Sequence, residues 1–244
     1  MQDSYLSKFK IESFIKSNGI NIKDFVVPAD GFKSFNDFFI RKIKPDVRQI
    51  DYDENCVISP ADCKVFVIQR LEEETEFFVK NNYFNLEKFL NDKDLAREYL
   101  GGTLILFRLR PKDYHRFHFP FDCIPTKAKA INGTLETVNP IAYKAGINPL
   151  TENERKLIFL KSEKFDDVAF VPVGAMMVGK ISETYKPNKE YLKGDEAGYF
   201  SFGGSSIVMI FKKNIVEVEH SFVANSEAGL ESEVLIGQRI ANKI

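Results

Sequence analysis

Two of the three histidines stand in one short segment, "DYHRFHF" at residues 113–119, and their side chains suit proton transfer. Histidine titrates near neutral pH and can act as a general base, a general acid or a metal ligand. If Pro111 starts a helical turn, His115 and His118 share a face, whereas in a continuous strand they lie on opposite faces. A metal would need a third ligand, which no nearby pattern marks. The interleaved charged and aromatic residues favour the wall of a functional site.

A second segment, "GYFSFGGSSIVMIF" at residues 198–211, places four small residues between an aromatic alternation and an apolar run. It is not a phosphate-binding loop, since the following lysine is missing, and it lacks the Gly-x-Ser-x-Gly pattern of a nucleophile elbow. Small residues let the backbone bend so that the hydroxyl of Ser205 reaches the carbonyl carbon of Gly204. That contact permits an N-to-O acyl shift, which turns an amide into an ester. A β-bulge explains the pattern equally well.

A third candidate is Asp62 in "SPADCKV", residues 59–65. The Ser-Pro pair marks a turn, and an aspartate at a turn is usually a turn-former or a helix cap. Its functional interpretation is that it orients a histidine, as the third member of a nucleophile–base–carboxylate set does.

The elements that must position these residues are mostly strands. From about Val57 the chain shows short β-type runs separated by Gly, Pro and Asn, which predicts an antiparallel β body with one helix at 85–100. Before it, residues 3–20 and 34–48 have helical spacing, the second capped by Ser34 and ended by Pro45. We expect an α+β fold with an amphipathic helical N-terminal segment at 1–50 and a β-rich domain at 51–244.

Charge narrows the choice of partners. The formal net charge is -1, which gives no overall field for nucleic acid. Residues 1–50 carry nine Lys/Arg against six Asp/Glu, and this basic, aromatic segment suits an anionic lipid surface.

Three cysteines favour a reducing compartment without disulfides. No run of about 20 apolar residues occurs, and we expect neither a membrane span nor a secretory signal.

Taken together and in order, these segments resemble the phosphatidylserine decarboxylase family, pyruvoyl-dependent enzymes that make phosphatidylethanolamine. The resemblance extends through almost the whole chain. Besides the histidine and glycine–serine segments, it includes "SFNDFFIRKIKPDVRQI", "SPADCKV", "FFVKNNYFNLEKFL", "NGTLETVNPIAYKAGINPLTENER", "VPVGAMMVGKI" and "NSEAGLESEVLIGQRI".

The resemblance implies a zymogen that cleaves itself between Gly204 and Ser205. Ser205 would become a pyruvoyl group at the start of residues 205–244, which stay bound to residues 1–204 as a heterodimer. A dimer of such heterodimers is also expected. No metal takes part.

The resemblance also implies roles for the other three candidates. His118 is expected to be the base toward Ser205, with Asp62 orienting it, and His115 is expected to serve the later decarboxylation. The substrate amine would condense with the pyruvoyl carbonyl as a Schiff base, and loss of carbon dioxide would then send electrons into that group. The protein would act in phospholipid biosynthesis, peripheral to the membrane on its cytoplasmic side.

The sequence departs from the family pattern at two places. Ser206 stands where threonine is usual, which leaves open which serine is processed; we expect Ser205, because it directly follows glycine. Cys63 stands where glycine is usual, and its side chain could crowd the turn or make the site sensitive to oxidation.

Other functions stay open at this point. One is pyruvoyl chemistry on another serine-headed lipid or a free amino acid. The others are a non-catalytic β-rich binding module, which predicts one intact chain, and a two-histidine metal hydrolase, which predicts bound metal.

Overall fold

The computed structural model describes the chain except residues 1, 78, 140, 176–179 and 204. The helices, two of them 3-10 segments, are η1 (Tyr5–Lys10), α1 (Ile11–Asn18), η2 (Ile22–Asp24), α2 (Phe35–Phe39), α3 (Leu86–Leu90), α4 (Lys93–Glu98), α5 (Ile141–Lys144), α6 (Pro149–Glu152) and α7 (His220–Glu227). The strands are β1 (Cys56–Ile58), β2 (Cys63–Gln69), β3 (Glu74–Phe77), β4 (Val79–Asn85), β5 (Thr103–Leu109), β6 (Arg116–His118), β7 (Ile124–Pro125), β8 (Lys129–Ile131), β9 (Arg155–Ser162), β10 (Asp166–Val173), β11 (Ile181–Glu183), β12 (Glu196–Phe200), β13 (Ser205–Phe211), β14 (Val216–Val218), β15 (Ser232–Val234) and β16 (Arg239–Lys243).

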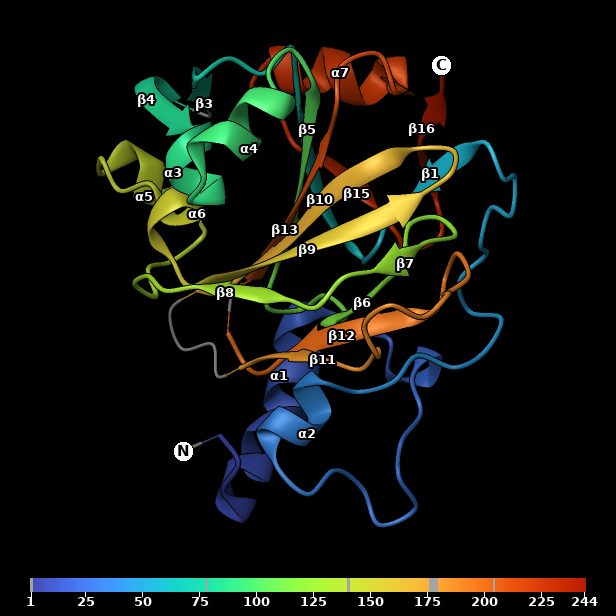
Figure 1. Ribbon diagram of the computed structural model, residues 1–244. Coiled ribbons are helices and arrows are strands. Elements are labelled where there is room, and N and C mark those ends of the chain that lie inside the picture. The colour runs from blue at the N-terminus through green and yellow to red at the C-terminus, as the bar shows by residue number, and fades with distance from the viewer. Residues whose placement is uncertain (1, 78, 140, 176–179, 204) are drawn as a thin grey trace.

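The largest sheet has the strand order β15-β2-β5-β13-β10-β9-β7, with β8 also paired to β9, and crosses the middle of the molecule (Figure 1). Its neighbouring strands pair antiparallel. β13 occupies a central position, with Ser205 opposite Leu109 of β5 and Ser206 opposite Val173 of β10. The mixed α+β fold with a mainly antiparallel β body is therefore confirmed.

Apolar side chains pack against both faces of this sheet, which explains why residues 207–211 of β13 are all apolar. Ile207, Met209 and Phe211 belong to the core cluster that contains Phe117 of β6 and Phe200 of β12. Val208 and Ile210 belong to a second cluster, which contains apolar residues of helices α3–α6. Smaller sheets, β1-β16-β14, β11-β12-β6 and β3-β4, surround the large one.

The helices differ from the expected ones at two places. The Oγ atom of Ser34 accepts from the Asp37 amide at 3.1 Å and caps α2 as predicted, but α2 ends at Phe39 rather than near Pro45. Beyond it, tertiary bonds replace the helical ones, since the Ile40 carbonyl accepts from Nε of Arg116. The helix expected at 85–100 is two helices, because Asn91 adopts a left-handed φ of 53° between them.

The N-terminal segment packs beneath the sheet β11-β12-β6, where α1 and α2 lie together in Figure 1. Phe35, Phe38 and Phe39 are buried there, and Phe202, which lies between β12 and β13, packs against them. Among the residues that the structure describes, no helix is both long enough and apolar enough to cross a bilayer. The domain boundary at residue 50 stays a prediction.

Candidate active site

Ser205 lies at the start of a central strand, in a fully buried position. Just before it, Gly203 has a φ of 150°, a conformation that favours glycine because a Cβ atom would be strained there. Gly204, the other partner of the predicted scissile bond, lies outside the described residues. Strand β13 therefore fixes the position of Ser205, and the chain just before it adopts a conformation at Gly203 that favours glycine.

His115 is the imidazole that contacts this serine. Its Nδ1 lies 3.2 Å from Oγ of Ser205, and its Nε2 lies 3.0 Å from the carbonyl oxygen of Arg110. A carbonyl oxygen can only accept, so Nε2 carries the hydrogen and Nδ1 is free to accept from the serine hydroxyl. The arrangement thus contains a nucleophile, a base and a group that orients the base.

The surroundings of His115 keep its imidazole neutral. Burial lowers its pKa to about 3, and the nearby Arg41 guanidinium adds to this effect. The ring stacks on Phe39, with 3.9 Å between ring centroids and 26° between the planes. A neutral imidazole can take a proton from a hydroxyl, so the site can activate Ser205 as a nucleophile at neutral pH.

His118 lies at a separate position. Its Nδ1 donates to the Gly194 carbonyl at 2.8 Å, and its Nε2 lies 3.2 Å from the hydroxyl of Tyr114. Burial lowers the pKa of His118 as well. In the described part of the chain no hydrogen bond joins His118 to Ser205, because the turn that begins at Pro111 ends before the histidines and extended backbone sends them to different partners. The role of His118 as base toward Ser205 stays a prediction.

Asp62 is buried, and its carboxylate is bound on both sides by groups other than histidine. Arg48 donates to it twice, at 3.1 Å through Nε and 2.7 Å through Nη2, and the Ile236 amide donates to Oδ1 at 2.9 Å. Among the described residues no hydrogen bond joins Asp62 to a histidine, and its role in orienting one stays a prediction. Its charge acts through space instead, raising the pKa of His118 against the larger effect of burial.

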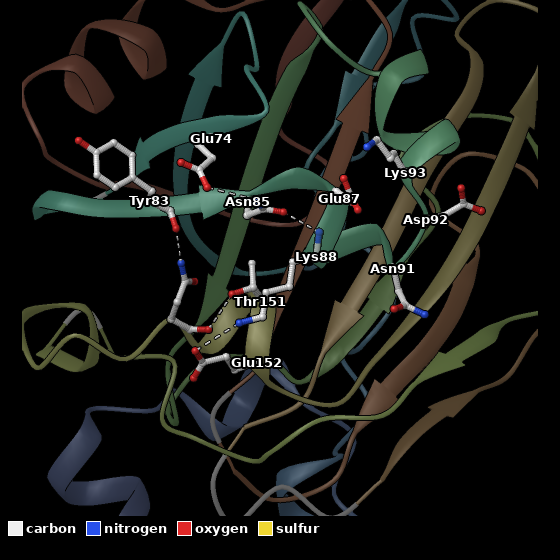
Figure 2. A pocket seen from close by; sticks show the side chains of 11 residues that line it. Glu74, Tyr83, Asn85, Glu87, Lys88, Asn91, Asp92, Lys93, Thr151 and Glu152 are labelled. Atoms are coloured by element: carbon white, nitrogen blue, oxygen red, sulfur yellow. Dashed lines mark hydrogen bonds and ion pairs between the residues drawn. The ribbon is translucent and has the colours of Figure 1, made fainter.

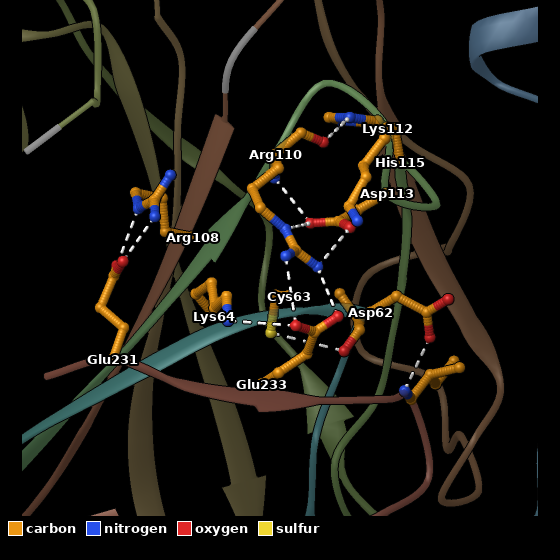
Figure 3. Close-up of polar contacts among 12 residues, drawn as sticks. Asp62, Cys63, Lys64, Arg108, Arg110, Lys112, Asp113, His115, Glu231 and Glu233 are labelled. Atoms are coloured by element: carbon orange, nitrogen blue, oxygen red, sulfur yellow. Dashed lines mark hydrogen bonds and ion pairs between the residues drawn. The ribbon is translucent and has the colours of Figure 1, made fainter. Parts of the chain in front are cut away.

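Asp62 belongs to a set of charged residues that we call the ion-pair cluster. Most of its members are labelled in Figure 3, and they are Arg48, Asp62, Lys64, Arg108, Arg110, Asp113, Glu231 and Glu233. Glu231 and Glu233 come from the end of the chain, whereas their partners come from strands β2 and β5 and the turn after β5. The cluster therefore joins residues on either side of the predicted cleavage point.

Cys63 fits the place where glycine is usual in the family pattern. Its thiol is buried, 3.5 Å from the carbonyl oxygen of Ala61 and 3.8 Å from Oγ of Ser59. Burial raises its pKa well above the ordinary value, which favours the less reactive thiol form. The side chain is accommodated without a strained contact to either of these groups.

Two observations bear on other kinds of site. In the described part of the chain, no group of three or more histidine, cysteine, aspartate or glutamate residues is placed to hold a metal ion. A polar pocket of about 770 Å³ lies between β4, α3 and α6, lined by residues such as Glu74, Lys88 and Glu152 (Figure 2). Neither histidine of the candidate site lines it, nor does Ser205.

Several residues that shape the site were not singled out from the sequence. Phe39 and Arg41 adjoin His115, Arg48 binds Asp62, and Asn36 accepts from the amide of Phe202 at 2.9 Å. All four come from the N-terminal segment, which we expected to face a membrane surface and which also carries part of the family resemblance. Their polar and aromatic character within "SFNDFFIRKIKPDVR" was the available signal.

The buried Ser205–His115 pair is an arrangement in which a neutral imidazole can activate a serine hydroxyl. A sequence model of one family, described as phosphatidylserine decarboxylase, matches residues 35–242. Relatives named phosphatidylserine decarboxylase proenzyme include one from Fusobacterium nucleatum, 43% identical over 97% of this chain and 79% of its own length. Others are from Clostridium novyi, 43% identical over 99% and 82%, and Chlamydia pneumoniae, 40% identical over 95% and 77%. The chain belongs to the phosphatidylserine decarboxylase family.

Proposed function

We propose that the chain is made as a precursor and, once processed, converts phosphatidylserine to phosphatidylethanolamine with release of carbon dioxide. Membership of the family supports the reaction. The observation that carries the mechanism is the contact between Oγ of Ser205 and Nδ1 of His115 in a buried position.

In the processing step, Nδ1 of His115 takes the hydroxyl proton of Ser205, and Oγ attacks the carbonyl carbon of Gly204. The C–N bond then breaks as the protonated His115 gives that proton to the leaving amine nitrogen of Ser205, and an ester forms. Removal of the serine α-proton breaks the ester and leaves dehydroalanine, whose hydrolysis consumes one water and releases ammonia. The products are residues 1–204 with a new carboxylate and residues 205–244 with a pyruvoyl group. The buried base supports this step because water does not compete for its nitrogen.

Ser205 is supported over Ser206 as the processed serine. Ser206 is buried on the opposite face of β13, and its hydroxyl has no hydrogen-bond partner in the described part of the chain. Ser205 alone of the two contacts a base. A ketone formed at position 205 would keep the same histidine beside it.

The ketone carbonyl of a pyruvoyl group supplies an electrophile for an amine and takes up electrons when carbon dioxide leaves. The chain's own residues supply the proton transfers around it. Nδ1 of His115, which accepts from position 205 in the precursor, is placed to return a proton there during decarboxylation. We assign His118 and Tyr114 to the adjacent wall of the site, and Asp62 to anchoring that wall through Arg48 and the Ile236 amide.

The two products are expected to remain together as a heterodimer. Residues 205–244 provide β13, which lies between β5 and β10 of the other product. Glu231 adds a bond to Arg108 at 2.7 Å between Oε1 and Nε. Separating the chains would remove the central strand of the main sheet. A dimer of these heterodimers and a location on the cytoplasmic side stay predictions.

Peripheral binding to a membrane is supported by the N-terminal surface. Tyr5, Leu6 and Phe9 are 64%, 72% and 72% exposed, and Lys8 lies over the rings of Tyr5 and Phe9. Exposed apolar side chains beside lysine suit an anionic lipid surface. Replacing Leu6 and Phe9 with glutamate should reduce cosedimentation with phosphatidylserine vesicles, and unchanged binding would contradict this part of the proposal.

Intact mass under denaturing conditions tests the processing proposal. Two chains whose masses sum to the precursor plus water minus ammonia are expected, and a Ser205→Ala variant should stay whole. A folded, active sample that contains one uncut chain would refute the mechanism. Decarboxylation assays with vesicles of phosphatidylserine and with water-soluble amino acids then separate the lipid substrate from the alternative of a free amino acid.

A further inference from the structure

Helix α2 contacts both partners of the proposed processing step. On one side, the ring of Phe39 stacks on His115. On the other, the ring of Phe202 packs edge-on against Phe35 and Phe39, with centroid distances of 4.9 and 5.0 Å. Phe202 lies two residues before Gly204. One short helix therefore adjoins the base and also the segment that leads into the scissile bond.

A polar contact fixes the backbone of that segment. Oδ1 of Asn36 accepts from the amide of Phe202 at 2.9 Å, and Nδ2 of Asn36 donates to a carboxylate oxygen of Asp3 at 2.8 Å. Because a carboxylate only accepts, Asp3 sets the orientation of the Asn36 amide group and directs its oxygen toward Phe202. The amide of Phe200 also donates to the carbonyl of His115 at 2.9 Å. The segment before the bond is thus tied both to α2 and to the histidine.

We propose that Asn36 is a positioning residue for self-processing, an inference that rests on the proposed function. Strand β13 holds the chain on the serine side of the bond, and Asn36 holds it on the glycine side. Attack by a hydroxyl requires the reacting atoms to be about 3–3.5 Å apart and aligned, and a displacement of about 1 Å can cost about 10²-fold in rate. Loss of the Asn36 contact frees the backbone of Phe202, which lies shortly before the scissile bond in the sequence.

The test measures conversion of the precursor with time, as the intact fraction on a denaturing gel after synthesis in a cell-free system. Asn36→Ala should slow conversion by about tenfold or more relative to the unmodified chain. The double variant Asp3→Asn with Asn36→Asp exchanges donor and acceptor, so a carboxylate still accepts from Phe202 and the new asparagine donates to it. That exchange should restore most of the rate.

A matched control separates positioning from general loss of stability. Oγ1 of Thr126 also accepts from a backbone amide, that of Phe159 at 2.9 Å, away from the site. Thr126→Val removes the same kind of bond and should leave conversion at the parent rate.

Each outcome has a distinct meaning. Conversion of Asn36→Ala at the parent rate, equal slowing by Thr126→Val, or failure of the double exchange to restore the rate would overturn the role of Asn36 while leaving the proposed function intact. If Asn36→Ala does not fold, the double exchange decides the matter alone. If the unmodified chain itself never cleaves, both the proposed function and this inference fall.

Discussion

The reaction centre and the ion-pair cluster lie close together but are built in opposite ways. Around Ser205 and His115 the partners are an aromatic ring, a backbone carbonyl and a neutral imidazole. In the ion-pair cluster, carboxylates and guanidinium groups neutralise one another across several strands. The first region keeps a base uncharged through burial, and the second holds charge by pairing it.

Under the proposed mechanism, this difference separates two tasks within one site. A base that must accept a proton from serine benefits from a lowered pKa, which keeps it unprotonated. Two chains that must stay together after a peptide bond is cut benefit from cross-strand contacts that do not depend on that bond. The comparison predicts that substitutions in the reaction centre change the rate of processing, whereas substitutions in the cluster mainly change stability.

Replacing His115, the proposed base, should cause the largest change in the rate of self-cleavage. His115→Gln removes the group that takes the serine proton, so we expect self-cleavage to slow by about 10²–10⁴-fold. His118→Gln, the matched control, alters a neighbouring imidazole without touching Ser205 and should slow cleavage much less. Intact mass against time gives both rates. A larger effect from His118→Gln would reverse the assignment and restore the expectation drawn from the family resemblance.

The lowered pKa of His115 also predicts a dependence of stability on pH. Its pKa is about 3 in the folded chain and about 6.5 in an unfolded one, so the unfolded state binds the proton more readily between these values. Stability from this group is present above about pH 6.5 and is lost as the pH falls. In an uncleaved Ser205→Ala background, the free energy of unfolding should fall between pH 7 and pH 5. Adding His115→Gln should make that fall smaller by about 2 kcal/mol. Urea unfolding at the two pH values measures it, and equal losses in both variants would show that His115 titrates normally.

The sequence predicted those features that depend on neighbouring residues. The run after Ser205 is a strand because β-branched and apolar residues follow one another there, and Ser34 caps α2 through an amide three residues away. Such patterns are decided within one element. The family resemblance supplied roles for Asp62, His115, His118 and Ser205, and these roles stay predictions.

The partner of each site residue could not be predicted, because the contacts join distant parts of the chain. Which histidine meets Ser205 depends on how β6 crosses the molecule, and the local spacing fitted either a helical turn or a strand. Asp62 binds Arg48 from one side in sequence and the Ile236 amide from the other. Local pattern holds no information about such pairings.

Within the ion-pair cluster, substitution of Asp62 should cause the largest loss in the free energy of unfolding. Asp62→Asn keeps an acceptor for the Ile236 amide but leaves the guanidinium of Arg48 without its charged partner in a mostly buried position. We expect a loss of about 1–3 kcal/mol in the free energy of unfolding, and slowing of cleavage by less than about tenfold. Urea unfolding in the Ser205→Ala background gives the first quantity. If Asp62→Asn arrested cleavage as fully as His115→Gln, the separation of the two regions would be wrong.

Substitution at the exposed edge of the ion-pair cluster should cause the smallest change in the free energy of unfolding. Glu233 accepts from Arg110 and pairs with Lys64, but its side chain is 54% exposed, whereas that of Glu231 is 14% exposed in its pair with Arg108. Water and salt weaken the Glu233 pairs, so Glu233→Gln should cost about 0–1 kcal/mol and less in high salt. Glu231→Gln should cost more, because it leaves the Arg108 guanidinium unpaired where solvent has little access. Unfolding of both variants at low and high salt tests this order. An equal, salt-sensitive loss in both would mean that solvent screens the whole cluster and that β13, rather than charge, holds the cut chains together.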